Sequence, residues 1–235
     1  MDSLRIVLVD TEGSINLGMI LRLSANFGAK EIFLVSSRTY NEEEILKYAV
    51  RASYLYSSIV RVSSLDEALS ECDVRICTTA KAREEDVLRN NVPSTKLPEL
   101  VSKYRKVCLV FGRESTGLTR EELSKCDFSS TIPTSEEYPA LNLANSVAIY
   151  LYELLSRSRS EKLGIEAAGR SQIEGAVSAF SGISSHVLKD PHKRERAERA
   201  FRQIAFRAAP SEREIKIVAH VLRRALRRIE SCQSK

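Results

Sequence analysis

Residues 132–155 read IPTSEEYPALNLANSVAIYLYELL, and the fold of the chain depends on this stretch. It begins at the end of a predicted strand with Ile132 and Pro133, and it tightens again after a polar turn. Asparagine is a residue type that caps helices, and from Asn142 onward the apolar spacing predicts a helix. The apolar stripe consists of Leu143, Val147, Leu151 and Leu154. Taken alone, the stretch fits both an ordinary strand–loop–helix joint and a ligand pocket built from backbone groups.

The composition is that of a globular protein with one large or two small domains. The chain has 235 residues, of which 43% are hydrophobic and 29% charged. No apolar run is long enough for a membrane span, and the strand pattern near the N-terminus leads us to expect no signal peptide.

The cysteines and histidines have no metal-ligand spacing, so we expect no structural metal. We expect the cysteines to be buried free thiols in a reducing cytoplasm. The residues concerned are Cys72, Cys77, Cys108, Cys126, Cys232, His186, His192 and His220.

Charge is distributed unevenly along the chain. Residues 1–155 carry 18 Lys and Arg against 22 Asp and Glu, whereas residues 156–235 carry 18 basic against 9 acidic residues. A basic segment of this length is typical of a polyanion binder, although a solvated helical face has the same composition.

The N-terminal part predicts an α/β sheet that opens with a strand at 5–9, a glycine-containing loop and a helix ending near Phe27. Gly13 and Gly18 have the spacing of a P-loop, but Met19 stands where that motif needs Lys. The motif GxGxxG is absent as well. Asn16 and Arg22 are the notable polar residues here, and Arg22 is either solvated or functional.

Strands and helices then alternate. We predict strands at 31–35, 59–62, 74–79, 107–111 and 128–132, and helices at 41–50, 64–72, 97–103 and 119–126, with a mobile loop at 81–93. Two helices open with capping boxes, at Ser64 and at Thr119. Ligands of such sheets bind beyond the carboxyl ends of the strands. The strand ends near Thr79, Gly112 and Ile132 and the turn at Leu141 are therefore expected to meet at one pocket.

The C-terminal part predicts a small helical domain after a charged linker. Helices are expected at 171–188, 192–207 and 211–229, with Pro191 in the first turn of the second and a capping box at Ser211. The last helix is expected to carry one apolar face with a basic rim beside it. The apolar residues are Ile215, Val218, Val221, Leu222, Leu226 and Ile229, and the basic ones are Arg223, Arg224, Arg227 and Arg228.

Three segments together resemble a known family. NLGMILRLSANFG, LVFGRESTGLTREEL and IPTSEEYPALNLANSVAIYLYEL occur in the order, and at about the separations, of the three motifs of the knotted SPOUT RNA methyltransferases. The resemblance is to the TrmH-like branch, and within it to tRNA ribose 2′-O-methyltransferases that act on the anticodon loop. It covers residues 1–156.

The resemblance implies an α/β trefoil-knot domain with a mainly parallel sheet, plus a small C-terminal all-α domain. It implies domain limits of 1–156 for the catalytic unit, 157–170 for a linker and 171–235 for a basic helical RNA-binding unit. S-adenosylmethionine (AdoMet) is the implied methyl donor, and no metal is expected. The cofactor-binding positions carried over are Thr78, Thr79, Ala80, Gly112, Ile132, Pro133, Pro139, Ala140, Leu141 and Asn142.

The same resemblance implies a cytoplasmic homodimer that methylates tRNA, at the anticodon-loop pyrimidine of position 32. Arg22 is implied to reach the substrate ribose across the subunit interface, and Asn16, Glu114 and Asn142 complete the catalytic set. Because a guanidinium keeps its proton, we expect Arg22 to orient the ribose and a phosphate. Ribosomal RNA as the substrate and a non-catalytic RNA-binding role are the alternatives.

One position departs from the family pattern. Relatives commonly have Ser where this chain has Ala140, and that hydroxyl is thought to assist at the reaction centre. Thr134, Ser135, Asn145 or a water molecule is expected to replace it.

Overall fold

The computed structural model describes residues 2–80, 91–156 and 167–233. The chain divides into two compact units, Met1–Lys162 and Leu163–Lys235.

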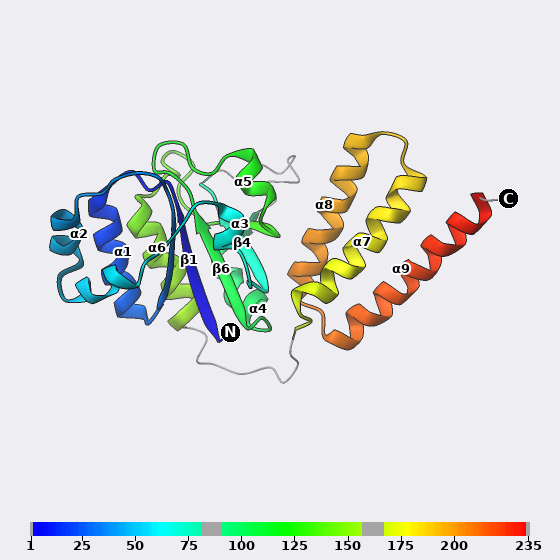
Figure 1. Cartoon of the computed structure of the whole chain (residues 1–235), viewed down its shortest axis with the longest axis horizontal. Helices are drawn as coiled ribbons and strands as arrows, with labels where there is room; N and C mark the ends of the chain where they lie inside the picture. Colours follow the sequence, from blue (N-terminus) through cyan, green and yellow to red (C-terminus); the bar gives the residue numbers. More distant parts are fainter. Residues whose placement is uncertain (1, 81–90, 157–166, 234–235) are drawn as a thin grey trace. The chain divides into compact units, whose positions relative to one another are not determined.

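A seven-stranded sheet forms the centre of the first unit, and all its described strand pairs are parallel. The strand order is β3-β2-β1-β6-β4-β7-β5, with β1 and β6 buried in the middle (Figure 1). This confirms the predicted α/β class with a parallel sheet. The strands are β1 (Ser3–Val9), β2 (Glu31–Val35), β3 (Val60–Val62), β4 (Val74–Thr78), β5 (Asn91–Pro93), β6 (Lys106–Phe111) and β7 (Phe128–Thr131).

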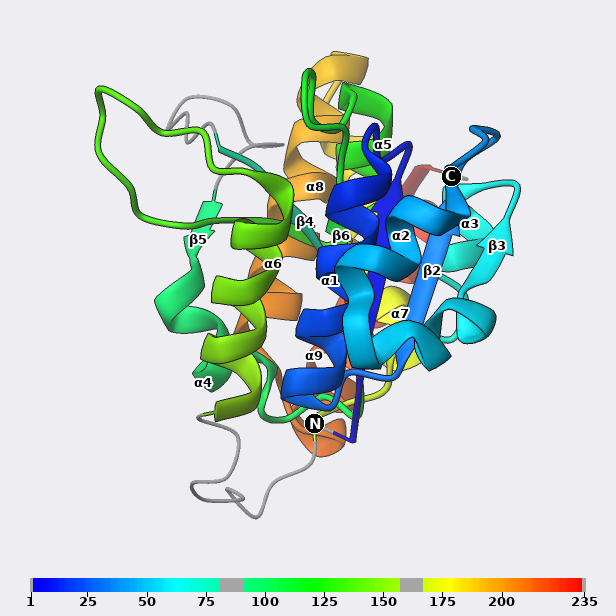
Figure 2. The same ribbon diagram turned by 90° about the vertical axis from the view of Figure 1, so that its left-hand side faces the viewer.

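Helices cover the sheet unequally. The long helix α1 packs against α2 and α6 on one face, where Figure 2 shows them side by side. The short helices α3 and α5 cover the other face, where their apolar residues join β1, β4 and β6 in one buried cluster. The helices are α1 (Ser14–Phe27), α2 (Glu42–Ala49), η1 (Val50–Ser58), α3 (Leu65–Ala68), η3 (Ser94–Lys96), α4 (Leu97–Val101), α5 (Arg120–Ser124), α6 (Leu143–Leu151) and the π-helical turn η4 (Tyr152–Ser156).

Two local predictions are wrong. Asn91–Pro93, expected in a loop, forms the edge strand β5 beside β7, while residues 81–90 of that loop lie outside the described part. Helix α3 ends at Ala68 instead of Cys72, because Glu71 adopts a left-handed conformation with φ of 62°. The capping box predicted there is incomplete, since the carboxylate of Glu67 accepts the amide proton of Ser63.

The expectation of buried free thiols is also wrong for four of the five cysteines. Cys72 is bonded to Cys108, and Cys77 is bonded to Cys126. All four belong to the apolar cluster under α3 and α5, so the bridges tie the thin helical cover to β4 and β6. Cys232 is free and exposed.

Three helices form the second unit: α7 (Arg170–Val187), α8 (Pro191–Ala208) and α9 (Glu212–Gln233). Pro191 opens α8, and Ser211 and Glu214 make the predicted reciprocal contacts at the start of α9. On α9, Val218 and Val221 are 43% and 59% exposed. None of the described helices is both long and apolar enough to cross a membrane.

We predict that reduction of the two bridges destabilises the first unit substantially. They close loops of 36 and 49 residues, for which the chain-entropy model gives roughly 4 kcal/mol per bridge. Guanidinium unfolding of the oxidised chain, and of chain refolded in dithiothreitol, should give a clearly lower midpoint for the reduced form. Cys232→Ser is the matched control and should respond to reductant as the unchanged protein does. Equal midpoints for the two forms would contradict a stabilising role.

Candidate functional site

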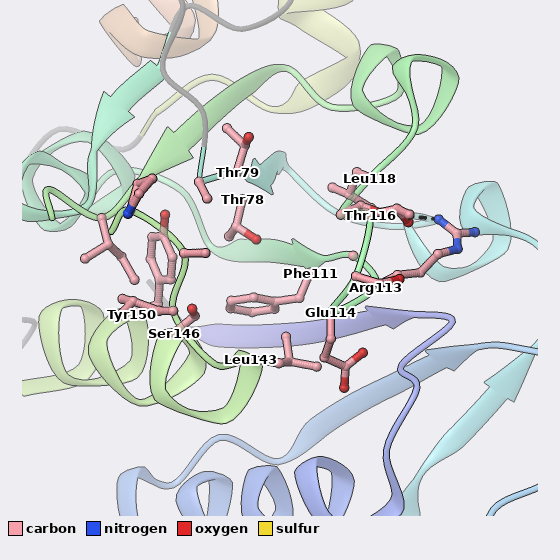
Figure 3. A pocket seen from close by; sticks show the side chains of 18 of the residues that line it. Thr78, Thr79, Phe111, Arg113, Glu114, Thr116, Leu118, Leu143, Ser146 and Tyr150 are labelled. Atoms are coloured by element: carbon pink, nitrogen blue, oxygen red, sulfur yellow. Dashed lines mark hydrogen bonds between the residues drawn. The ribbon is translucent and has the colours of Figure 1, made fainter. Parts of the chain in front are cut away.

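A cavity of about 290 Å³ lies beyond the carboxyl ends of β4, β6 and β7. The turn before α6 closes it from the opposite side (Figure 3). The predicted site residues that line the cavity are Thr78, Thr79, Ala80, Gly112, Glu114, Ile132, Pro139, Ala140 and Leu141. The structure thus brings together four segments that are far apart in the sequence, as the predicted convergence of strand ends requires.

Four predicted site residues do not line this cavity: Pro133, Asn142, Asn16 and Arg22. Conversely, the sequence prediction missed lining residues of two kinds. Phe111, Leu118, Leu123, Leu143 and Tyr150 supply an apolar wall. Arg113, Ser115, Thr116 and Gly117 belong to the polar loop after β6, and Ser146 lies on α6. Apart from Leu123 on α5, these residues lie at the end of β6, in the loop after it or on α6, close in sequence to the predicted site residues Gly112, Glu114 and Asn142.

A hydrogen-bonded chain of three side chains joins the loops around the cavity. Asn16 donates from Nδ2 to Oε1 of Glu114 at 2.7 Å, and Asn142 donates from Nδ2 to Oδ1 of Asn16 at 3.0 Å. The other carboxylate oxygen of Glu114 accepts the backbone N–H of Glu12 at 2.7 Å. We call Glu114, Asn16 and Asn142 the loop network. It connects the start of α1, the loop after β6 and the start of α6.

Asn142 has a second task in its own helix. Its Oδ1 accepts the backbone N–H groups of Ala144 and Asn145, at 2.9 and 3.3 Å. These are amides of the first turn that lack partners within the helix. The N-cap predicted from the sequence is confirmed, and the same side chain anchors α6 to the loop network.

A reciprocal contact strengthens the joint between the first two loops. The carboxylate of Glu12 accepts the backbone N–H and the hydroxyl of Ser115, at 3.1 and 2.6 Å. The hydrogen bond from the Ser115 hydroxyl is the main cause of the lowered pKa of Glu12. Each loop therefore places one glutamate against the backbone of the other.

Arg113 holds the base of the loop after β6. Its guanidinium donates to Asp10 at 2.8 Å and to both carboxylate oxygens of Glu122 at 3.1 Å. Burial raises the pKa of Glu122, but the hydrogen bonds from Arg113 and Thr119 outweigh burial and lower it. Arg113 and its neighbour Glu114 do not pair with each other, since the two side chains point apart (Figure 3).

Two glycines allow this loop to turn tightly. A Cβ atom on Gly112 would lie 2.4 Å from the carbonyl carbon of Gly117, which is far inside contact distance. Gly117 itself has a φ of 70°, a conformation that favours glycine. The backbone after β6 can therefore approach the cavity without a side chain in between.

The wall formed by α6 is tied to the far edge of the sheet. The hydroxyl of Tyr150 donates to Ser130 at 3.2 Å, and Ser130 donates to the carbonyl of Val92 at 2.7 Å. Burial raises the pKa of Tyr150, so this phenol stays neutral and its ring packs edge-on against Phe111 with the centroids 5.7 Å apart.

The missing serine at Ala140 is not replaced by the residues that we expected. Thr134, Ser135 and Asn145 do not line the cavity. The hydroxyl of Thr134 donates to Pro139, and that of Ser135 accepts from Glu137. Ser146 is the hydroxyl of α6 that does line the cavity, and it donates to the backbone carbonyl of Asn142 at 3.2 Å.

Arg22 lies on the exposed side of α1, away from the loop network. It follows Asn16 by six residues, so it is about 9 Å further along the helix and turned by about 120°. Its side chain has no hydrogen bond or ion pair within the described part of the chain. Within one chain, the predicted catalytic set is thus divided into the loop network and a separate arginine.

The described residues contain no group of three or more His, Cys, Asp or Glu side chains that could hold a metal ion.

Residues 3–152 match the model of the SpoU rRNA Methylase family. The chain belongs to this family. It is 33% identical to the tRNA (cytidine-2'-O-)-methyltransferase TrmJ of Methanocaldococcus jannaschii, over 89% of this chain and 94% of the relative. It is 39% identical to the TrmJ of Sulfolobus acidocaldarius, over 68% of each chain.

A solved structure, a probable methylase family protein from Haemophilus influenzae, superposes with a TM-score of 0.68 at 27% identity, covering 98% of this chain and 99% of the other. The resemblance that the three sequence motifs carry, to methyltransferases of the TrmJ type, is confirmed by these relatives. The chain is an RNA methyltransferase by family.

Proposed function

We propose that the protein transfers a methyl group from AdoMet to a ribose 2′-hydroxyl of tRNA. The observation that carries this proposal is the cavity at the strand ends, whose loops are joined by the loop network. The two archaeal relatives are named as tRNA cytidine 2′-O-methyltransferases, which supports tRNA as the substrate class. From the resemblance that the three sequence motifs carry, we also propose the pyrimidine at position 32 of the anticodon loop as the target.

The lining of the cavity suits AdoMet in several ways. Gly112 leaves backbone exposed, because a side chain there would collide with Gly117. The hydroxyl of Thr78 donates a hydrogen bond to the backbone carbonyl of Val110 within the sheet. Thr78 therefore leaves a smooth cavity wall for an adenine ring. Leu141 and Leu143 add apolar surface at the mouth. When bound, the cofactor supplies a methyl group already activated on a sulfonium, and no metal is needed.

The chain must then align the ribose hydroxyl with the methyl carbon and guide its proton away. In the transfer, the hydroxyl oxygen forms a bond to carbon while the carbon–sulfur bond breaks. Fixed loops suit this task, because in-line transfer depends on the positions of the reacting atoms. Glu114 and Asn16 hold the loops by hydrogen bonds. Arg22 orients the hydroxyl and a neighbouring phosphate, and a phosphate oxygen or a water molecule accepts the proton.

A homodimer would bring Arg22 to this place. In a single chain, Arg22 stands apart from the loop network on the exposed side of α1. Helices α1 and α6 pack together. Ile15 of α1 is 38% exposed, and Tyr152 of η4, which directly follows α6, is 57% exposed. Pairing of this face with a second copy would bury both side chains and place the arginine of one copy at the cavity of the other.

The second unit is proposed to hold the RNA. Residues 156–235 carry twice as many basic as acidic residues, and Arg213, Arg224, Arg227 and Arg228 are exposed on α9. Such side chains bind phosphates without reading sequence. We assign residues 1–156 to catalysis, 157–170 to a linker and 171–235 to RNA binding.

We propose the cytoplasm as the location, because tRNA is the substrate. Disulfides are rare in that compartment, but intracellular proteins of hyperthermophiles are an exception. The two bridges are compatible with this location only for a protein of that kind.

The second candidate function is that of a non-catalytic RNA-binding protein, and Ala140 at the place of the usual serine is the one observation that favours it. The intact loop network speaks against it, since a binding surface on the second unit does not require that network. Ribosomal RNA is the alternative substrate, because the family is named for rRNA methylation.

We predict that the protein forms 2′-O-methylated pyrimidine at position 32 when it is incubated with AdoMet and unmodified tRNA. Mass spectrometry of nuclease fragments locates the modified ribose, and ribosomal RNA serves as the competing substrate. Methylation of ribosomal RNA alone would replace the proposed substrate. Absence of transfer to either RNA would favour the binding protein.

We further predict that two inactive variants restore each other's activity. Arg22→Ala lacks the arginine and keeps its pocket, while Asn142→Ala disturbs the pocket and keeps the arginine. If Arg22 acts on the cavity of the other copy, an equal mixture refolded together should regain about one quarter of wild-type activity, from one intact site in each mixed symmetric dimer.

Separately folded variants, mixed without exchange of subunits, are the control. If the refolded mixture is no more active than the mean of the two variants, Arg22 serves the cavity of its own chain. Arg22→Lys alone should also lose most of its turnover, since lysine keeps the charge but lacks the planar fork.

A further inference from the structure

Helix α9 carries two apolar strips, and the second unit covers only one of them. Ile215 and Ala219 are buried at 3% and 4%, and Leu226 lies so close to α7 that a Cβ on Gly182 would touch it. In Figure 1, α7 lies between α8 and α9, so the far side of α9 has no neighbour among the described residues of the unit.

The uncovered strip is apolar over two turns. Ile217, Val218 and Val221 are 59%, 43% and 59% exposed, and Ala225 is partly exposed beside them. With about 100° per residue, these four side chains lie within one sector of the helix that differs from the sector of Ile215 and Ala219. We call them the outer strip. Contiguous exposed apolar side chains of this kind mark interaction sites.

The charges at the two ends of the outer strip are complementary. Glu214 lies seven residues before Val221 and Arg228 seven residues after it, and both are exposed. Seven residues correspond to two helical turns, so both lie in the sector of Val221. Glu214 caps its helix through Oε2, and a carboxylate can accept further hydrogen bonds.

We propose that the outer strip pairs with the outer strip of a second copy of this chain, antiparallel, about a two-fold axis at Val221. In that arrangement Val221 meets Val221, and Ile217 of each copy meets Ala225 of the other. Glu214 of each copy lies opposite Arg228 of the other, so the same patch complements itself, as a two-fold interface requires. A parallel pairing would bring Arg228 against Arg228.

RNA is a poorer occupant of this strip. Phosphates are bound by the basic residues on the neighbouring sector, such as Arg224 and Arg227, whereas Ile217 and Val221 offer nothing to a phosphate. Pairing through the outer strip would leave Arg227 exposed, so both copies could still bind RNA.

The contact between the two copies of α9 is separate from the proposed contact between copies through the α1 and α6 face. The α9 contact is stabilised when that other contact forms. One pair of helical strips is smaller than a stable protein interface. If the catalytic units already hold two copies together, the second contact forms at a raised effective concentration. The α9 contact therefore rests on the proposed homodimer for its strength, and light scattering on the full chain reports the homodimer independently.

The test is site-directed disulfide formation in the full chain. Val221→Cys in a Cys232→Ser background puts a thiol on the proposed axis, and mild oxidation should link most of the protein into covalent dimers. His220→Cys in the same background is the matched control. It is one residue away but points about 100° to the side, and it should give several-fold less dimer. Val221 is exposed, so the substitution leaves the core untouched.

The native Cys232 decides the direction of the pairing. It lies eleven residues from Val221, so the two copies of Cys232 would be about 30 Å apart in the antiparallel arrangement. The unchanged protein should therefore form no covalent dimer through Cys232. Equal linking by the Val221→Cys and His220→Cys proteins would overturn the pairing even if light scattering shows a dimer, and efficient linking through Cys232 would overturn its antiparallel direction.

Discussion

The carboxylate of Glu114 is the contact on which the site depends. One oxygen accepts the side chain of Asn16 and the other accepts the backbone of Glu12, both at 2.7 Å. A charged acceptor makes shorter and stronger hydrogen bonds than a neutral one. The loop after β1 is thereby fixed to the loop after β6, although the two are about one hundred residues apart.

Asn142 links these loops to α6, the last α-helix of the catalytic unit. Its amide nitrogen reaches Asn16 and its oxygen caps α6, so the helix cannot shift without breaking its contact with the start of α1. Tyr150 holds the same helix to β7 and β5 through Ser130. The cavity lies between these two attachments. Its shape is thus set by polar contacts around the rim and by the Phe111–Tyr150 packing within the wall.

Local signals in the sequence predicted the local structure well. The limits of β2, the cap at Asn142 and the capping box at Thr119 were predicted correctly, because each depends on residues close in sequence. The three motifs also indicated the family and most of the cavity lining. The trefoil knot implied by that family stays a prediction.

Features that depend on distant partners were not predicted. The bridges join cysteines 36 and 49 residues apart, and only the strand order brings them together. The partners of Arg113 come from the strand end at Asp10 and from α5. On α9, two adjoining strips are both apolar, and packing against α7 decides which one is buried.

A double-mutant cycle in AdoMet affinity tests most directly whether the loop network assembles the pocket. The variants are Glu114→Gln, Asn142→Ala and the double substitution, each titrated with AdoMet by calorimetry. Both single variants should bind more weakly, and the second substitution should add little once the first has broken the network. A coupling energy of at least about 0.5 kcal/mol is expected for residues in one network. Strictly additive losses, or unchanged affinity in all three variants, would contradict this account.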